Sequence, residues 1–260
     1  ILMKIEFKHK ESLGQNFLIN KEISRKISFL KDFKNQEIVE VGPGKGYLTK
    51  FIIKRRPSKL ILIEKDKTLN TILSNLIKNK GIEIKLIIGD ALKISINKLS
   101  KKKIILIGNL PYNIATTLIL NWLKYINSFK SIIVMVQKEV ASRLSAEKKT
   151  RHYGRISVLI QVLAEVKVKF DVAPENFFPK PKVHSSIIEI IPKKKVEFDY
   201  NKLDKFLKIS FTHKRKTLKN NLSKISSNIE EKIFKCGIDP ALRPEEISPN
   251  QFIKLSQELL

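Results

Sequence analysis

The residues best suited to chemistry are four consecutive ones in the middle of the chain, Asn109-Leu110-Pro111-Tyr112. They follow a largely apolar run at 103–106 that predicts a buried strand, so they stand where that strand ends. The Asn109 side-chain oxygen and a carbonyl of Leu110 or Pro111 can accept both N–H groups of an exocyclic amine. The Tyr112 ring can stack on the heterocycle that carries this amine. The alternative is an ordinary strand-to-turn junction, because Asn and Pro both favour turns.

A glycine turn, Gly42-Pro43-Gly44-Lys45-Gly46, is the second candidate for a binding site. It joins a β-rich run at 37–41 to a helical pattern at 47–53, which is typical of the first unit of a Rossmann-like sheet. Gly42 and Gly44 would let the backbone approach a ligand at the helix N-terminus. Because the spacing is G-x-G-x-G and not G-x-G-x-x-G, we expect an adenosyl ligand without phosphates in preference to a dinucleotide.

Two carboxylates end the strands that are predicted next along the chain. Glu64 follows the run at 59–63, where a carboxylate can accept both hydroxyl protons of a ribose. Asp90 follows the run at 84–88, where it could accept a hydrogen bond from an adenine amino group. For Asp90 the equally good alternative is that it caps the following turn.

Strands and helices alternate along the first two thirds of the chain. Helices are expected at 20–30, 47–53, 66–79, 115–126, 137–146 and 156–164. This pattern predicts an α/β fold, a Rossmann-like, doubly wound and mostly parallel sheet, with a further strand at 131–136. The glycine turn, Glu64, Asp90 and Asn109 would then meet at the carboxyl ends of neighbouring strands. That convergence is the strongest indication of a ligand site.

The run at 166–172 alternates like a half-exposed strand, and 185–191 is its expected antiparallel partner. The loop between them contains Phe177 and Phe178, two prolines and two lysines, a composition that suits stacking on a base beside a phosphate. We assign the stacking role to Phe177. Adjacent aromatic residues are more often part of a core, so one of the two is expected to be buried.

The composition changes from residue 192 onward. Strand-like alternation stops, and short helices are expected at 201–211, 217–225, 229–235 and 250–260. The sequence therefore predicts a catalytic domain at 1–192 and a small helical RNA-binding domain at 193–260.

The net charge is +26, with 51 Lys+Arg against 25 Asp+Glu and a sequence pI of about 10.0, which points to a polyanionic partner. Lysines far outnumber arginines, so compositional bias could account for part of this charge. Clusters are better evidence than totals. The candidate RNA-binding residues lie in two basic segments: Lys148, Lys149, Arg151 and Arg155 in the first, and Lys214, Arg215, Lys216 and Lys219 in the second. The alternative for the second segment is a solvated charged helix face.

Other functional classes find little support. Cys236 is the only cysteine, and the four histidines are scattered, so neither disulfides nor a metal site are expected. No run reaches the ~18 apolar residues of a membrane span, and residues 1–10 lack the apolar stretch of a signal peptide. We therefore expect a cytoplasmic protein that binds neither metal nor membrane.

Motifs along nearly the whole chain make it similar to the ribosomal RNA adenine N6,N6-dimethyltransferases, and in particular to the bacterial small-subunit branch. They are Leu13-Gly14-Gln15-Asn16-Phe17-Leu18, Glu40-Val41-Gly42-Pro43-Gly44, Ile63-Glu64-Lys65-Asp66, Gly89-Asp90-Ala91-Leu92, Asn109-Leu110-Pro111-Tyr112-Asn113-Ile114, Gln137-Lys138-Glu139-Val140, Tyr153-Gly154-Arg155, the F-x-P-x-P-K-V pattern of Phe177 to Val183, and Arg215-Lys216-Thr217-Leu218. Three positions depart from the family's pattern: Ala115, His184 and Lys214.

The resemblance implies S-adenosylmethionine as methyl donor, held by Asn16, Leu18, Gly42, Glu64, Asp90 and Asn109. It also implies two adjacent adenines near the 3′ end of small-subunit (16S) ribosomal RNA as targets, the immature 30S subunit as partner and a role in ribosome biogenesis. A monomer is expected. The related large-subunit enzymes that confer macrolide resistance resemble the catalytic domain only.

Three further readings stay open at this point. The protein could be an RNA-binding assembly factor with methylation secondary. It could be a nicotinamide-dependent oxidoreductase, although the glycine spacing argues against this class. An N6-adenine DNA methyltransferase would use a similar amine clamp.

Overall fold

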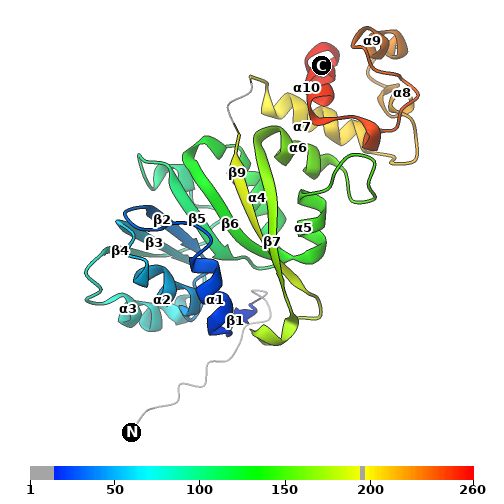
Figure 1. The fold of residues 1–260 in the computed structure, drawn as a ribbon. Coiled ribbons are helices and arrows are strands. Elements are labelled where there is room, and N and C mark those ends of the chain that lie inside the picture. The colour runs from blue at the N-terminus through cyan, green and yellow to red at the C-terminus, as the bar shows by residue number, and fades with distance from the viewer. Residues whose placement is uncertain (1–14, 194–196) are drawn as a thin grey trace. The chain divides into compact units, whose positions relative to one another are not determined.

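The computed structural model describes residues 15–193 and 197–260 (Figure 1). Leu13 and Gly14 of the N-terminal motif, and residues 1–10, where no signal peptide was expected, lie outside the described residues. The strands are β1 (Phe17–Leu18), β2 (Glu37–Val41), β3 (Lys59–Glu64), β4 (Glu83–Ile88), β5 (Ile104–Asn109), β6 (Phe129–Gln137), β7 (Ala164–Val172), β8 (Phe177–Phe178) and β9 (Ser185–Pro192).

The α-helices are α1 (Lys21–Ser28), α2 (Tyr47–Lys54), α3 (Asn70–Ile77), α4 (Ala115–Leu123), α5 (Lys138–Leu144), α6 (Arg155–Leu163), α7 (Tyr200–Ser210), α8 (Leu218–Leu222), α9 (Ile229–Lys235) and α10 (Pro249–Leu259). Short 3₁₀ helices occupy Lys67–Leu69, Ile96–Lys98, Ile126–Ser128, Pro174–Asn176 and Pro244–Glu246. Helix α3 begins later than expected, because the Asp66 side chain caps a 3₁₀ turn that precedes it.

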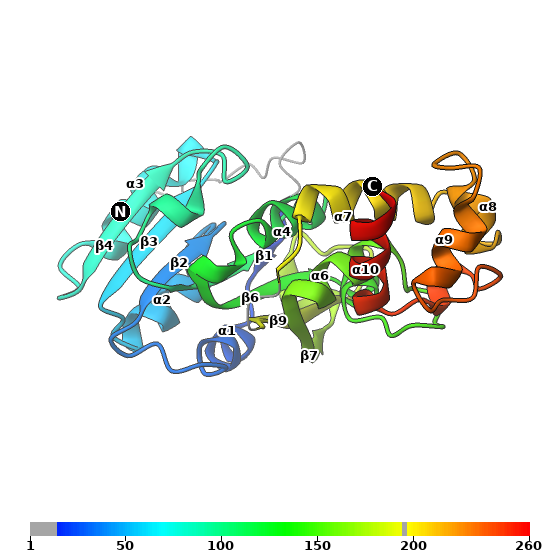
Figure 2. The same ribbon diagram turned by 90° about the horizontal axis from the view of Figure 1, so that it is seen from above.

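The main sheet contains seven strands in the order β4-β3-β2-β5-β6-β9-β7. The pairs β2·β3, β2·β5, β3·β4 and β5·β6 are parallel, which confirms the predicted doubly wound sheet. Strands β9 and β7 are neighbours, as their alternating patterns predicted. Helices α1 and α2 lie on one face of the sheet and α4 on the other, as Figures 1 and 2 both show.

Apolar runs explain why the central strands are buried on both faces. Strands β2, β3 and β5 are almost continuously buried, as expected for parallel strands covered by helices. On one face, Ile38 and Leu60 pack against Leu48 and Ile52 of α2 and Ile27 of α1 in a single core cluster. This core fixes the direction in which the strand ends present their polar groups.

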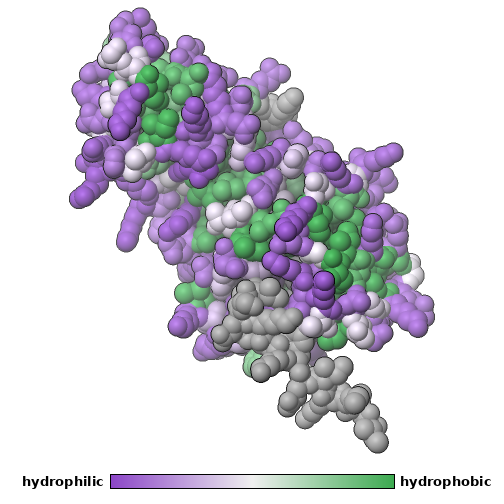
Figure 3. All heavy atoms as spheres, turned by 180° about the vertical axis from the view of Figure 1, so that it is seen from behind, coloured by the Kyte–Doolittle hydropathy of each residue, from purple (hydrophilic) through white to green (hydrophobic). Residues whose placement is uncertain are grey.

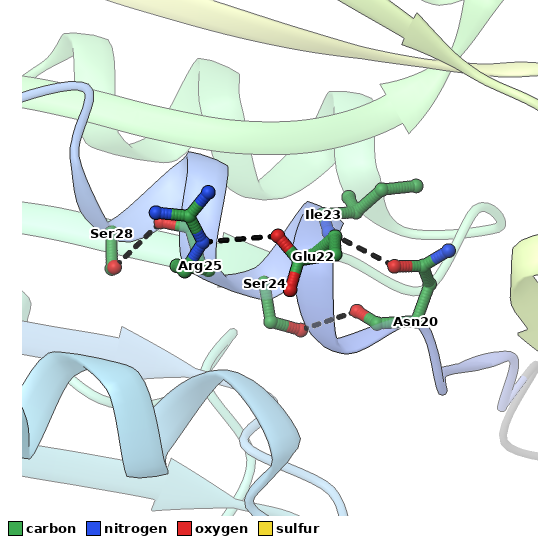
Figure 4. Close-up of polar contacts among 6 residues, drawn as sticks. All are labelled: Asn20, Glu22, Ile23, Ser24, Arg25 and Ser28. Atoms are coloured by element: carbon green, nitrogen blue, oxygen red, sulfur yellow. Dashed lines mark hydrogen bonds and ion pairs between the residues drawn. The ribbon is translucent and has the colours of Figure 1, made fainter.

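Helix α1 begins as the sequence predicted, because Asn20 caps it (Figure 4). The Asn20 side-chain oxygen accepts a hydrogen bond of 3.0 Å from the Ile23 backbone N–H. The Asn20 amide also donates to the Asn176 side chain at 2.8 Å. These contacts join the start of α1 to the segment that precedes β8.

The chain divides into two compact units. Among the described residues, the first unit contains the chain up to Lys138 and Val168–Glu189, and the second contains Glu139–Lys167 and Ile190–Leu260. This division differs from the expected boundary at 192/193, because residues 139–167 group with the C-terminal helices. The Tyr153 hydroxyl explains the grouping in part, since it donates to the Ile247 carbonyl at 2.9 Å.

An aromatic core holds the second unit together. The Phe206 and Phe252 rings meet edge to face at a centroid distance of 6.4 Å, and Phe211 lies 5.5 Å from Phe252. The centroids of the Tyr153 and Phe211 rings lie 6.3 Å apart, and Tyr153 is fully buried.

At the surface, hydrophilic side chains dominate, and hydrophobic ones form patches between them (Figure 3).

Candidate functional site

The register of the parallel strands brings the predicted polar groups to one edge of the sheet. Val41 pairs with Ile63 on one side and with Gly108 on the other, so Gly42, Glu64 and Asn109 follow at neighbouring strand ends. The expected convergence is confirmed for these groups, and Asp90 lies just beyond the end of β4.

Three cavities open along this edge. Gly42 lines all three, Asn109 lines the first and second, and Glu64 lines the second and third. The shared lining residues make them adjoining parts of one site.

Glu64 is buried beside the glycine turn. Its Oε2 atom accepts the Gly44 backbone N–H at 3.0 Å, and its Oε1 atom accepts the Asp66 N–H at 2.8 Å. Burial raises the pKa of Glu64, and the hydrogen bonds from these N–H groups oppose that rise. The carboxylate therefore holds the turn in place, and Glu64 also lines the second and third cavities.

Asp90 lines the third cavity together with Ile63, Glu64 and Pro111. Its Oδ1 atom accepts the Leu92 N–H at 3.0 Å, so the turn-capping interpretation is confirmed. Its Oδ2 atom lies 2.9 Å from the Lys65 ammonium, and this hydrogen-bonded ion pair lowers the pKa of Asp90. Capping does not exclude ligand binding, because a carboxylate has further lone pairs.

Asn109 is oriented by the segment that contains Asn16. The Asn109 Nδ2 atom donates to the Asn16 carbonyl at 2.7 Å, so the amide nitrogen faces Asn16. The Oδ1 atom is then the group that can accept an N–H from a ligand. Leu110, Pro111 and Tyr112 line the second cavity beside it. The arrangement fits the amine clamp that the sequence predicted.

The glycine turn packs so closely against neighbouring residues that side chains would not fit at Gly42 and Gly44. Gly42 has φ +71°, and a Cβ atom there would lie 3.2 Å from the Asn109 carbonyl oxygen. Gly44 has φ +58°, and its Cβ would lie 2.8 Å from the Phe17 ring. The Gly42 backbone, the Glu64 carboxylate and the Asn109 acceptor line the adjoining cavities and suit an adenosyl ligand, so these residues fit S-adenosylmethionine.

Asn16 and Leu18, implied as cofactor contacts by resemblance, also lie at this site. Asn16 lines the second cavity and Leu18 the first. Leu18 is 5% exposed and belongs to the same core cluster as Phe177, its partner in the β1·β8 pair. Their roles toward the cofactor stay predictions.

Phe177 is buried, and Phe178 is exposed. Phe177 is 3% exposed, whereas Phe178 is 60% exposed, so the expectation that one of the two would be buried is confirmed. Successive residues of a strand face opposite sides, which separates the two rings. A stacking role for Phe177 would need its ring to leave the core, and it stays a prediction.

Sequence reasoning missed Glu40, a fully buried carboxyl group that lines the first cavity. Neither its Oε2 atom nor the Thr49 hydroxyl makes a hydrogen bond of ordinary geometry within the described chain, although Thr49 is close enough to oppose the rise in the Glu40 pKa. Burial raises the pKa of Glu40 from its usual 4.5 to about 8. The available signal was a charged residue inside an otherwise apolar run at 38–41.

The raised pKa of Glu40 predicts a stability that falls with pH. Below pH 4.5 the carboxyl is neutral in both the folded and unfolded chains, and its contribution is fully present. As the pH rises from 4.5 toward 8, the carboxyl of the unfolded chain loses its proton while that of the folded chain keeps it. The unfolded chain is thereby favoured, and the free energy of unfolding decreases. Glu40→Gln should remove this loss, on the order of a few kcal/mol.

Chemical denaturation of wild type and Glu40→Gln at pH 5 and pH 8 measures this effect. The difference in free energy of unfolding between variant and wild type should grow toward pH 8. A pH dependence that is parallel in the two proteins would contradict the assignment.

The second unit brings the two basic segments together. The Lys214 ammonium donates to the carbonyls of Arg151 and Tyr153 at 3.4 and 3.3 Å, which joins segments far apart in sequence. Six of the eight predicted residues are exposed: Lys148, Lys149, Arg151, Lys214, Arg215 and Lys216.

Two of the predicted basic residues form ion pairs with acidic side chains. Arg155 lies 2.6 Å from Asp204, and Lys219 lies 3.0 Å from Glu230. The cations of Arg215 and Lys216 have no such pair among the described residues, which makes them the better candidates for contact with phosphate.

Two searches bear on other classes of function. Within residues 15–193 and 197–260, no group of three His, Cys, Asp or Glu side chains is arranged to hold a metal ion. Across that same part of the chain, every helix is too short or too polar to cross a membrane.

Comparison with known proteins identifies relatives over almost the full length. The profile of the family described as ribosomal RNA adenine dimethylase matches residues 6–260. A protein of Pelagibacter ubique (strain HTCC1062) named ribosomal RNA small subunit methyltransferase A is 41% identical over 258 residues, covering 96% of this chain and 97% of that protein. A protein of the same name from Wolbachia pipientis wMel is 37% identical, covering 99% of this chain and 91% of that protein.

Solved structures share the fold. A dimethyladenosine transferase from Plasmodium falciparum superposes with a TM-score of 0.78 at 24% identity, covering 92% of this chain and 95% of that chain. The 23S rRNA methyltransferase ErmE superposes with a TM-score of 0.71 at 20% identity, covering 94% of this chain and 99% of that chain. At these identities the likeness concerns the fold, which is that of a Rossmann-like methyltransferase.

Proposed function

The chain belongs to the ribosomal RNA adenine dimethylase family, whose members use S-adenosylmethionine, and we propose that its targets are two adjacent adenines near the 3′ end of small-subunit (16S) ribosomal RNA. It is an enzyme that dimethylates adenines of small-subunit ribosomal RNA. The observation that carries the proposed target chemistry is the oriented Asn109 amide at the end of β5.

The reacting group is an aromatic amine, whose lone pair is delocalised into the ring and is therefore weakly nucleophilic. When the Asn109 Oδ1 atom and the Leu110 or Pro111 carbonyl accept its two N–H groups, the nitrogen is biased toward a tetrahedral geometry. S-adenosylmethionine supplies an electrophilic methyl group when bound. Positioning of the amine then accounts for several kcal/mol of the barrier, about 7 or more in the most favourable cases.

We assign further roles to residues around the clamp. Glu64 accepts the ribose hydroxyls, Asp90 accepts the adenine amino group of the cofactor, and Gly42 and Gly44 admit its backbone contacts. The Tyr112 ring stacks on the target adenine, which must leave its own stack to enter. A second methylation requires that the clamp also accept a monomethylated amine.

The partner that we propose is the immature 30S subunit, with the exposed basic residues of the second unit as phosphate contacts. Support comes from the net charge of +26 and from the two basic segments that Lys214 joins. A monomer acting in the cytoplasm, where subunits are assembled in bacteria, is the simplest form of this proposal.

The double variant Arg215→Ala/Lys216→Ala tests the phosphate contacts. Its affinity for small subunits should fall by roughly 10-fold, and the slope of log affinity against log salt should shrink by about 2. Filter binding over a salt series measures both. The control, Lys205→Ala/Lys232→Ala, removes the same charge from exposed positions of the same unit. If both double variants lose the same affinity, the loss reflects net charge and not phosphate contacts of Arg215 and Lys216.

The function itself is tested by methyl transfer from labelled S-adenosylmethionine to unmethylated small subunits, large subunits and duplex DNA, followed by mass spectrometry of the nucleosides. We expect dimethyladenosine with small subunits only. Transfer to large subunits or DNA would reassign the substrate. Tight binding to small subunits without transfer would favour an assembly factor, the second candidate that the basic surface supports.

A further inference from the structure

A hydrogen bond joins the hydroxyl of Tyr112 to that of Ser185, a residue far along the chain in the same unit. The Tyr112 Oη and Ser185 Oγ atoms lie 2.5 Å apart, although 73 positions separate the residues in sequence. Ser185 is fully buried at the start of β9, whereas Tyr112 is only partly buried and lines the cavity that Asn109 also lines. The serine therefore contacts the far end of a ring whose face borders the proposed target site.

Ser185 is held in place by its own backbone. It begins a strand inside the main sheet, between β6 and β7. The carbonyl of the preceding residue, His184, accepts the Lys138 N–H at 2.9 Å, directly after the end of β6. Burial raises the pKa of Tyr112, so its hydroxyl keeps its proton at neutral pH and can donate to the serine.

We propose that Ser185 is a positioning residue, which sets the tilt of the Tyr112 ring against the target adenine. This inference rests on the proposed function. A tyrosine ring turns about two side-chain bonds, and the backbone after β5 fixes only its first atom. The hydrogen bond to the buried strand holds the hydroxyl at the other end, so the direction of the long axis of the ring is set before the adenine arrives.

The direction of this axis affects the rate because stacking depends on where the ring lies relative to the target adenine. Base stacking on an aromatic side chain contributes about 1–3 kcal/mol, and a tilted ring loses part of it. A small misplacement of the amine relative to the methyl donor costs more, up to about 100-fold in rate. Ser185 itself need not touch RNA or cofactor.

The test compares Ser185→Ala, Tyr112→Phe and the double variant. Single-turnover methyl transfer is measured on unmethylated small subunits at saturating S-adenosylmethionine, together with cofactor affinity and the unfolding midpoint of each protein. Each single variant should be about 10-fold slower than wild type, as expected for one lost buried hydrogen bond, with cofactor affinity within about 2-fold. The double variant should be no slower than the slower single variant, because all three lose the same bond.

Stability separates positioning from a structural role. Tyr112→Phe leaves the buried Ser185 hydroxyl unpaired, and Ser185→Ala leaves the partly buried Tyr112 hydroxyl unpaired. The double variant leaves neither and should regain stability. If Ser185 only supports the fold, the double variant should regain activity together with stability. If it positions the ring, the double variant should be stable and still slow. If a single variant fails to fold, the double variant still tests the proposal, because it lacks the same hydrogen bond.

Ser186→Ala is the matched control. Ser186 is equally buried on the same strand, but its hydroxyl contacts Asp171 at 2.7 Å and not Tyr112, so its transfer rate should equal that of wild type. A Ser185→Ala rate within 2-fold of wild type, or recovery of activity in the double variant, would overturn the proposal. Failure of wild type to methylate small subunits would instead refute the proposed function.

Discussion

Asn109→Ala is expected to slow methyl transfer by about 100- to 1,000-fold, the range seen when one preorganised hydrogen-bonding group is removed from an active site. The variant lacks the Oδ1 acceptor, so the target amine keeps its planar, weakly nucleophilic geometry. Cofactor affinity should fall by much less, because Glu64, Asp90 and the Gly42 turn remain, although the contact that orients Asn16 is lost. Single-turnover transfer and calorimetric cofactor binding measure the two effects separately.

Asn109→Asp is the informative companion variant. Aspartate keeps an oxygen acceptor at the same place but cannot donate to the Asn16 carbonyl. It should therefore retain more activity than the alanine variant. Normal turnover in Asn109→Ala would remove this residue from the catalytic role.

Glu64→Ala should show the opposite pattern, with cofactor affinity lowered by more than about 100-fold and transfer at saturating cofactor changed only a few-fold. Two hydrogen bonds from ribose hydroxyls to a carboxylate are lost, and each charged hydrogen bond contributes about 1.5–3 kcal/mol. The Gly44 and Asp66 N–H groups also lose their acceptor, which loosens the glycine turn. Calorimetry and saturation kinetics measure these quantities.

Glu64→Gln controls for the loosened turn, because its side-chain oxygen can still accept one of the two backbone N–H groups. We expect an affinity between those of wild type and Glu64→Ala. If Glu64→Ala binds the cofactor normally, the carboxylate supports the turn alone and the ribose assignment is wrong.

Much of the site was predictable because it depends on local pattern and on parallel pairing. Apolar runs followed by Gly42, Glu64, Asp90 and Asn109 predicted strand ends at one edge, and the register of β2 with its neighbours confirms that arrangement. A carboxylate or amide that directly follows a buried parallel strand lies at the carboxyl edge of the sheet.

Contacts between distant segments were not predictable in the same way. The sequence contains no sign that residues 139–167 pack with the C-terminal helices, because contacts such as Tyr153 with Ile247 depend on the fold. Nor does it indicate that Arg155 and Lys219 are ion-paired while Arg215 is exposed.

The sequence by itself determined the α/β class, the edge of the sheet where the polar strand ends meet and the residue types of the proposed amine clamp. Those features follow from periodicity and from the chemistry of single side chains. Only the tertiary structure decided that Phe177 is buried and Phe178 exposed, that Glu40 is buried without a partner for Oε2, and that Ser185 contacts Tyr112. Burial and pairing across many residues depend on how strands align in three dimensions, and no local pattern specifies that alignment.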